Sequence, residues 1–200
     1  MRVRDLEVVY QRGGEPAVHG VSFDLGAGEG LLITGDRGSG KTSVLRALLG
    51  LVQPTGVVEL LGGRPGDIVL QQRVGYAPEG RTFDERHSPR EIVGLVCAIR
   101  LGRGSRDIAE DALERAGLPV DRRGARDLQI EDTRRVAMAC AIAADPEVLI
   151  LDDPWEFVET EREIARARAR GAAVVVATHE PGGFPILLGR TLTLVDGHPA

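Results

Sequence analysis

Short apolar runs and helix-forming stretches alternate along the chain, and the two patterns predict different elements. Consecutive apolar residues at 148–151 and 173–177 are typical of strands buried on both faces of a parallel sheet. A shorter apolar run at 31–33 leads into a glycine-rich turn, after which apolar residues recur at helical spacing until Gly50 ends the helix. These patterns predict an α/β fold.

Shorter strand patterns occupy the first part of the chain. Residues 3–10 and 17–25 are predicted strands joined by the turn QRGGEP. Residues 57–61 and 73–77 are further predicted strands, separated by the turn-rich segment GGRPGD. The last of these must end at Pro78, because proline restricts the residue before it and cannot donate to a strand ladder.

From about residue 80 to residue 145 the apolar positions follow a helical period. Ser88 starts the first helix as an N-cap and is followed by a first-turn proline and a capping-box glutamate. Ser105 caps a second helix, and a third covers about 132–144 and is halted by Pro146. We interpret this region as an inserted helical block.

The glycine-rich turn carries the clearest chemical motif. Residues 35–42 read GDRGSGKT and fit the pattern G-x-x-x-x-G-K-[ST], in which glycines let backbone N–H groups face the phosphates of a nucleotide. Lys41 would reach the β- and γ-phosphates, and the Thr42 hydroxyl would ligate Mg²⁺. A glycine-rich hairpin turn could produce part of this pattern, but the strand before it and the helix after it favour a phosphate loop.

Composition supports this interpretation and limits the class of protein. Of the 25 basic residues, 24 are arginine, and the only lysine in the chain is Lys41. The net charge is −5 and the arginines are interspersed with acids, so nucleic acid is not an expected partner. Cys97 and Cys140 lie in apolar helical surroundings and are predicted to be buried small hydrophobes in a reducing cytoplasm.

No apolar run is long enough to span a bilayer, and the charged start MRVRDLE is unlike a signal peptide. A chain of 200 residues is an ordinary length for one domain. We therefore expect a soluble single domain that is able to dock on a membrane protein.

Three motifs occur in a fixed order: the phosphate loop, the strand end VLILDDP and the strand end ATHE. With this order the chain resembles an ATP-binding-cassette (ABC) ATPase subunit over essentially its whole length. The resemblance implies one nucleotide-binding domain over residues 1–200 with a P-loop NTPase fold. This fold has a RecA-like core sheet, an N-terminal antiparallel β part and an inserted helical subdomain at about 80–145, and it binds ATP and Mg²⁺.

The resemblance also assigns roles to single residues. Asp152 matches the Walker B aspartate, which holds Mg²⁺ through water in the family, and Asp153 takes the position of the carboxylate that orients or deprotonates the attacking water. His179 matches the histidine that senses the γ-phosphate, and Tyr10 matches the aromatic on which adenine stacks, although an aromatic on an edge strand would explain Tyr10 equally simply. The implied catalytic residues are Lys41, Asp153 and His179; the nucleotide-binding residues are Tyr10, Gly35, Asp36, Arg37, Gly38, Ser39, Gly40, Lys41, Thr42 and Ser43; the metal site is Thr42, Asp152 and Glu79.

The departures from the family pattern are informative. The family usually has glutamate where this chain has Asp153, which is one methylene shorter. A misplacement of about 1 Å can reduce a rate on the order of a hundredfold, so slow hydrolysis is expected. Glu79 stands where glutamine is usual, PWEFVE replaces PTSALD, and two prolines and two glycines after His179 predict that the helix there is broken or shortened.

The signature LSGGQ aligns with Leu128 to Asp132, which read LQIED. In the family this segment caps a helix that points at the γ-phosphate bound by the opposite subunit. Glu131 and Asp132 would satisfy the dipole of that helix themselves and would repel a phosphate. A homodimer would therefore contain two defective signatures, and a heterodimer with a second ATP-binding subunit is expected.

The favoured function is the ATP-binding subunit of an ABC-type transporter, with weak ATPase activity in the isolated chain. Its expected partners are a transmembrane permease subunit and a second ATP-binding subunit, and it would lie on the cytoplasmic face of the cell membrane. One alternative is a non-transporting nucleotide-binding regulator, which the changes at Asp153 and LQIED favour. Another is a different P-loop enzyme such as a small-molecule kinase, which His179 and Tyr10 disfavour.

Overall fold

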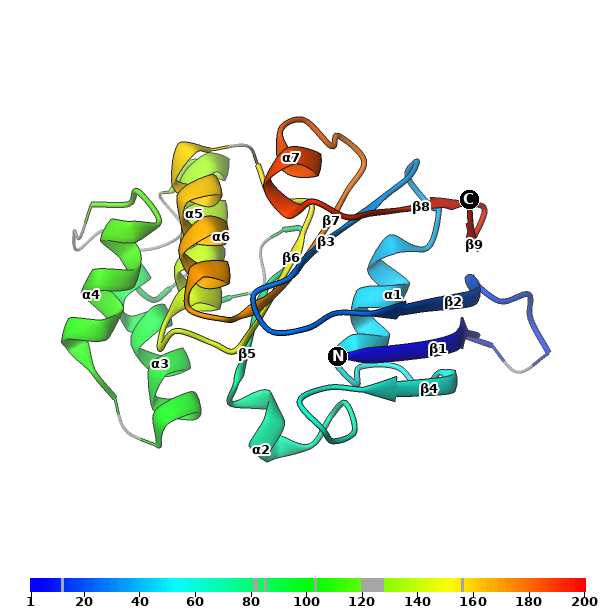
Figure 1. Ribbon diagram of the computed structural model, residues 1–200. Coiled ribbons are helices and arrows are strands. Elements are labelled where there is room, and N and C mark those ends of the chain that lie inside the picture. Colours follow the sequence, from blue (N-terminus) through cyan, green and yellow to red (C-terminus); the bar gives the residue numbers. More distant parts are fainter. Residues whose placement is uncertain (12, 81–82, 85, 103, 120–127, 156) are drawn as a thin grey trace.

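The computed structural model describes residues 1–11, 13–80, 83–84, 86–102, 104–119, 128–155 and 157–200 (Figure 1). The strands in these parts of the chain are β1 (Arg2–Val8), β2 (Val18–Asp24), β3 (Gly30–Thr34), β4 (Thr55–Glu59), β5 (Val74–Ala77), β6 (Val148–Asp152), β7 (Ala173–Thr178), β8 (Thr191–Val195) and β9 (His198–Pro199). The helices are α1 (Lys41–Leu48), α2 (Ile68–Gln71), α3 (Pro89–Leu101), α4 (Arg106–Arg115), α5 (Ile130–Ile142), α6 (Val158–Ala169) and α7 (Phe184–Leu188).

The described strands form two sheets. The core sheet has the order β5-β6-β7-β3-β8-β9, and its strands are parallel except for β9, which is antiparallel to β8. The second sheet has the order β2-β1-β4 and is antiparallel. Helices α3, α4 and α5 follow one another between β5 and β6 in the sequence. The predicted fold class is therefore confirmed.

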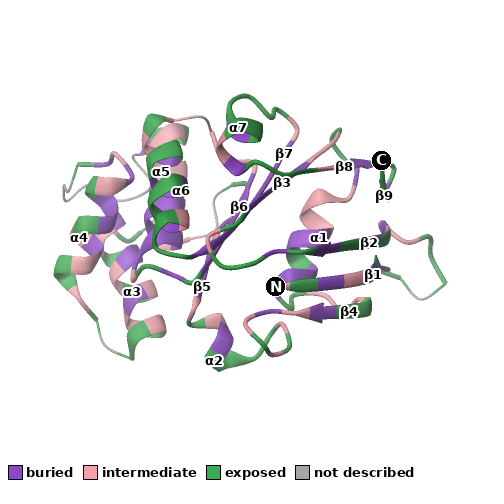
Figure 2. Cartoon of the chain, in the orientation of Figure 1, coloured by how far each residue is buried: buried purple, intermediate pink, exposed green. Residues whose placement is uncertain are grey.

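The core sheet is covered on both faces, which explains its continuous apolar runs. In β6, Val148 and Ile150 belong to a cluster with α1 and the antiparallel sheet, whereas Leu149 and Leu151 belong to a cluster with helices α3 to α7. Successive side chains of a strand point to opposite faces, so consecutive residues of such a strand are apolar until the polar residues at its carboxyl end. Strands β6 and β7 are buried along their whole length (Figure 2).

The helix boundaries follow local sequence signals. Ser88 forms the expected capping box at the start of α3, and the Ser105 side chain caps α4. Helix α5 begins two residues before the expected 132 and ends at Ile142. The element after His179 is α7, which has only five residues, as its prolines and glycines predicted.

Several features were not expected or were expected differently. The segment GGRPGD does not lead directly into a strand: α2 intervenes, and the Asp67 side chain caps it. The strands β8 and β9 were missed, although the alternating TLTLV and the turn at Asp196 and Gly197 could have predicted a hairpin. Cys97 is buried as predicted, but Cys140 is only partly buried.

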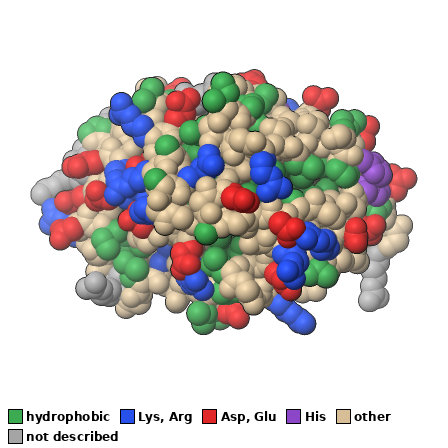
Figure 3. All heavy atoms as spheres, in the orientation of Figure 1, with side chains coloured by type: hydrophobic (Ala, Val, Ile, Leu, Met, Phe, Trp, Pro, Cys, Tyr) green, Lys and Arg blue, Asp and Glu red, His purple; other side chains and the backbone are tan. Residues whose placement is uncertain are grey.

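None of the described helices is both long enough and apolar enough to cross a membrane. On the face of the molecule shown in Figure 3, acidic and basic side chains are interspersed. The two signs of charge therefore alternate over this face in space as they do along the sequence.

A buried ion pair joins the helical region to the core. The Arg115 guanidinium at the end of α4 donates to both carboxylate oxygens of Glu163 in α6, and these side chains are only 11% and 6% exposed. Arg115 also donates to Asp111 at 3.1 Å and to Asp145 at 3.2 Å. The charge of this largely covered arginine is thus compensated by three carboxylates, of which Glu163 is itself buried.

We expect Arg115→Ala to lower the free energy of unfolding by about 3–5 kcal/mol, because it leaves the buried Glu163 carboxylate without its partner. Urea denaturation followed by circular dichroism measures this. The control is Arg106→Ala, which removes an ion pair with Glu110 whose arginine is 70% exposed. That change should be below about 1 kcal/mol, and equal losses in the two variants would contradict the role of the buried pair.

Candidate nucleotide-binding site

The phosphate loop connects β3 to α1 and requires glycine at two points. Gly35 has a φ of 146°, and a Cβ there would lie 2.2 Å from the carbonyl oxygen of Leu194 in β8. Gly40 has a φ of 95°, and a Cβ there would lie 2.4 Å from the carbonyl oxygen of Ala17. Both distances are far inside van der Waals contact, and L side chains rarely adopt these φ angles. Only glycine therefore fits this turn.

The ammonium group of Lys41 lies inside the loop. Its Nζ donates to the carbonyl oxygens of Gly35 and Asp36, both at 2.7 Å, and to Ser39 Oγ at 3.4 Å. Burial lowers the pKa of Lys41, while the charges of nearby carboxylates, Asp153 first among them, oppose this. The only lysine of the chain is thus held by main-chain oxygens of the loop.

Thr42 and Asp152 form a pair of oxygen donors next to this loop that suits a metal ion. The Thr42 hydroxyl donates to Asp152 Oδ1 at 3.2 Å, joining the start of α1 to the end of β6. Burial raises the pKa of Asp152 to about 6, helped by the like charges of Glu79 and Asp153 and opposed by the Thr42 hydrogen bond. A buried carboxylate beside a hydroxyl is a set of hard oxygens that fits Mg²⁺, whose positive charge would relieve the repulsion among the carboxylates.

The second acidic residue, Asp153, is held by β7. Its Oδ1 accepts from Thr178 Oγ1 at 2.9 Å and lies 2.9 Å from His179 Nδ1. Burial opposes ionisation of Asp153, but the hydrogen bonds of Thr178 and His179 outweigh it, and the pKa of Asp153 is below its ordinary value. Asp153 is therefore poised as a carboxylate directed at His179.

His179 also reaches the phosphate loop. Its Nε2 lies 3.4 Å from Arg37 Nη2 and 3.5 Å from the carboxylate of Glu180. The imidazole thus connects Arg37 in the loop with Asp153 at the end of β6. A cleft of about 730 Å³ opens beside this group, lined in part by Arg37, Asp153 and His179.

The remaining predicted residues lie around this centre. Tyr10 is beyond the end of β1, so it is not an edge-strand aromatic; its hydroxyl donates to Ser43 Oγ at 3.1 Å and accepts from Arg46 at 3.3 Å. Its side chain is half exposed beside α1. Glu79 follows β5 and is exposed, yet its charge acts on Asp152. The structure therefore gathers all the sequence-predicted residues around one edge of the core sheet.

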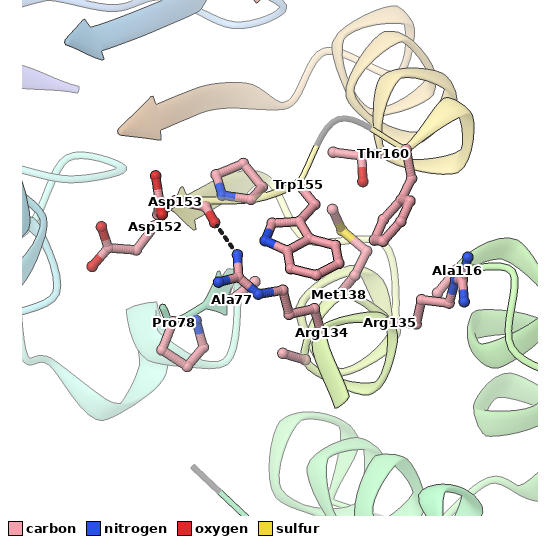
Figure 4. A pocket seen from close by; sticks show the side chains of 13 residues that line it. Ala77, Pro78, Ala116, Arg134, Arg135, Met138, Asp152, Asp153, Trp155 and Thr160 are labelled. Carbon is pink, nitrogen blue, oxygen red and sulfur yellow. Dashed lines mark hydrogen bonds between the residues drawn. The ribbon is translucent and has the colours of Figure 1, made fainter. Parts of the chain in front are cut away.

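Sequence reasoning missed one residue at this edge. Arg134, in the first turns of α5, donates from Nη1 to the backbone carbonyl of Asp153 at 2.8 Å (Figure 4). Its guanidinium lies over the ring of Trp155, 4.6 Å from the centroid. The aromatic residues in PWEFVE were a signal that this segment packs against something, although Glu156 of the same segment lies outside the described residues.

The start of α5 carries negative charge. Gln129 is the N-cap but makes no side-chain capping bond, and Glu131 and Asp132 occupy the first turn. Asp132 accepts from Arg135 at 2.9 Å. Acids in this position complement the helix dipole without any added anion.

Comparisons with known proteins agree on one family. A family model described as ABC transporter matches residues 18–156. The cytochrome c biogenesis ATP-binding export protein CcmA of Pseudomonas putida is 34% identical over a stretch that covers 82% of this chain and 85% of that protein. The energy-coupling factor transporter ATP-binding protein EcfA2 of Thermotoga maritima is 30% identical, covering 90% of this chain and 74% of that protein.

Solved structures agree on the fold. The dimeric structure of a bacterial ABC transporter cassette superposes with a TM-score of 0.89 at 23% identity, covering 99% of this chain and 95% of that chain. The family match over residues 18–156 and the relatives confirm the resemblance inferred from the three sequence motifs.

We expect Gly40→Ala to weaken the binding of a fluorescent ATP analogue at least tenfold, because the added methyl meets the Ala17 carbonyl and distorts the loop. It should also lower the free energy of unfolding by about 1–3 kcal/mol. The matched control is Gly94→Ala in α3, where a Cβ meets nothing within 4 Å and φ is ordinary. Unchanged nucleotide affinity in Gly40→Ala would contradict the placement of the site.

Proposed function

The chain belongs to the ABC transporter family, and on this premise we propose that it is the ATP-binding subunit of an ABC-type transporter that hydrolyses ATP slowly. The observation that carries the proposal is the convergence of Lys41, the Thr42–Asp152 pair and the Asp153–His179 pair at one edge of the core sheet. Open α/β sheets bind ligands at this edge. The Thr42–Asp152 pair joins the start of α1 to the end of β6, and the Asp153–His179 pair joins the residues that follow β6 and β7, so the site exists only in the folded chain.

Each residue of the site has a separate role in the proposed reaction. Bound Mg-ATP supplies the phosphoryl group to be transferred and a divalent charge. Lys41 neutralises phosphate charge, and Thr42 and Asp152 hold the metal. Asp153 orients the attacking water, with His179 hydrogen-bonded to its carboxylate. Because Asp153 is short and already bonded to Thr178 and His179, it is poorly placed for this task and turnover is slow.

The charge at the start of α5 supports a heterodimer. In a family-like dimer this helix start faces the triphosphate bound by the other subunit. Here Glu131 and Asp132 would meet that phosphate and repel it. The site that contains this chain's own loop would instead be completed by the intact signature of a different subunit.

An apolar groove supports a membrane-embedded partner. A groove of about 430 Å³ runs between α2 and α3, and Leu51, Ile68 and Ile99 on it are 65%, 78% and 65% exposed. Neighbouring exposed apolar side chains of this kind favour a protein contact. We propose that a transmembrane permease subunit binds here, which would hold the chain at the inner face of the cell membrane.

A nucleotide-binding regulator without transport activity is the second candidate. The acids at the start of α5 and the engaged carboxylate of Asp153 favour it, because both act against turnover and neither acts against nucleotide binding at the chain's own phosphate loop. The two candidates share the nucleotide site and differ in whether hydrolysis and a permease are used.

We expect the isolated chain to bind Mg-ATP and Lys41→Ala to lose most of this affinity, because the variant removes the only ammonium that reaches the phosphates. Titration with a fluorescent ATP analogue measures it, with the surface variant Arg64→Ala as control. Amine-directed labelling gives a second readout, since saturating ATP should protect Lys41 and leave only the N-terminal amine reactive. Labelling that ATP does not affect would count against the site.

We expect the two departures to be non-additive. Asp153→Glu alone should raise turnover little, because no competent signature faces the bound ATP. Replacing residues 129–132 with SGGQ alone should promote an ATP-bound homodimer that hydrolyses slowly, having a short carboxylate behind the water. The combined variant should hydrolyse about a hundredfold faster than the unmodified chain, as groups that act as one catalytic unit do.

Steady-state phosphate release from the four proteins at matched concentration decides this. Full activity of Asp153→Glu by itself would favour a self-contained P-loop enzyme. An inactive combined variant that still binds ATP would favour the regulator.

A further inference from the structure

Arg134 makes two contacts with the segment that follows β6. Its Nη1 donates to the backbone carbonyl of Asp153 at 2.8 Å, and the carbon at the centre of its guanidinium lies 4.6 Å from the centroid of the Trp155 ring. Figure 4 shows the guanidinium beside the indole, with a dashed line to the Asp153 carbonyl. A planar guanidinium is able to donate in its plane and stack with its face at the same time, which an ammonium cannot do.

The backbone of Asp153 is held at both its N–H and its carbonyl. Its φ of 47° is in the left-handed region, which aspartate adopts more readily than most non-glycine residues and which Asp5, Asp145 and Asp196 of this chain also adopt. Its N–H donates to the carbonyl of Ala177 at 2.7 Å, and its carbonyl accepts from Arg134. The residue is therefore anchored on both sides, by β7 through the N–H and by α5 through the carbonyl. This anchoring directs the carboxylate at Thr178 and His179.

The neighbouring contact of Arg135 with Phe157 can be compared directly with that of Arg134 with Trp155. Arg135 lies over the Phe157 ring at 4.6 Å, and the Trp155 and Phe157 rings are 5.6 Å apart. Arg135 bonds to Asp132 at 2.9 Å in its own helix turn. Among the described residues both arginines cover an aromatic ring, but only Arg134 also holds Asp153.

We propose that Arg134 is a positioning residue that holds the water-orienting carboxylate of Asp153 in place, with Trp155 holding the guanidinium. The inference rests on the proposed function for the role of Asp153. Because α5 starts at the segment aligned with the signature, a shift of its first turns moves the carbonyl anchor of Asp153. A contact of another subunit with Glu131 or Asp132 would thereby change the position of Asp153 in the chain's own nucleotide site.

The chain offers a direct optical probe, because Trp155 is its only tryptophan. Without nucleotide, Arg134→Ala should make Trp155 emission more accessible to acrylamide quenching, and Arg134→Lys should give an intermediate value because it keeps the charge and loses the planar stack. Hydrogen exchange of the peptide containing Asp153 should become faster in Arg134→Ala. Arg135→Ala, the matched control, should leave the exchange of that peptide unchanged.

The second readout is kinetic. In the variant with residues 129–132 replaced by SGGQ, which keeps Asp153 and is expected to hydrolyse slowly, Arg134→Ala should lower kcat about tenfold, as expected for a misplaced catalytic group, with KM within about twofold. Arg134→Lys should recover part of kcat. A rise in KM with kcat unchanged would show that Arg134 acts on binding, and would overturn the proposal.

Three results separate this inference from the function on which it rests. If the unmodified chain fails to bind Mg-ATP, the nucleotide site is wrong, and the exchange measurement still decides whether Arg134 anchors Asp153. Unchanged exchange in Arg134→Ala, verified as folded by circular dichroism, would overturn the anchor. Equal effects of Arg134→Ala and Arg135→Ala would show that the two arginines only cover the aromatic rings.

Discussion

Parallel pairing of β6, β7 and β3 is the constraint on which the site depends. In this register Asp152 lies opposite Ala177, and Thr178 lies opposite Thr34, the last residue before the phosphate loop. The ends of three strands therefore meet at one edge, and each delivers polar groups there. A shift by one residue would turn these side chains to the opposite faces of the sheet. The continuous apolar runs prevent such a shift only indirectly, through packing against helices on both faces.

Several carboxylates lie close together at this edge, and the surrounding structure shifts the pKa values of Asp152 and Asp153 in opposite directions. Asp152 is buried beside Glu79 and Asp153, and its pKa rises to about 6. Asp153 receives hydrogen bonds from Thr178 and His179, and its pKa falls despite burial. Neighbouring carboxylates whose pKa values are driven apart are suited to different tasks, one to holding a cation and one to acting as a fixed carboxylate.

Long-range side-chain contacts then join the parts that surround the edge. Arg37 in the loop approaches His179, Arg134 of α5 holds the Asp153 carbonyl, and Arg115 of α4 pairs with Glu163 of α6. In each case an arginine makes the link. The use of arginine at nearly every basic position is consistent with this, because its planar fork donates several hydrogen bonds in fixed directions.

The sequence by itself determined the features that local chemistry decides. The loop glycines and Lys41 follow from a motif, the buried strands from continuous apolar runs, and the start of α3 from the Ser88 capping box. Only the tertiary structure decided that β8 lies beside β3, where its Leu194 carbonyl excludes a side chain at Gly35. It alone decided that the Asp153 carboxylate turns to His179 and that Arg134 anchors its backbone. The reason is physical: hydrogen-bond partners 19 to 142 residues apart, such as Arg134 with Asp153 and Arg37 with His179, meet only through the strand order and helix packing of the whole chain, which no local pattern of residues encodes.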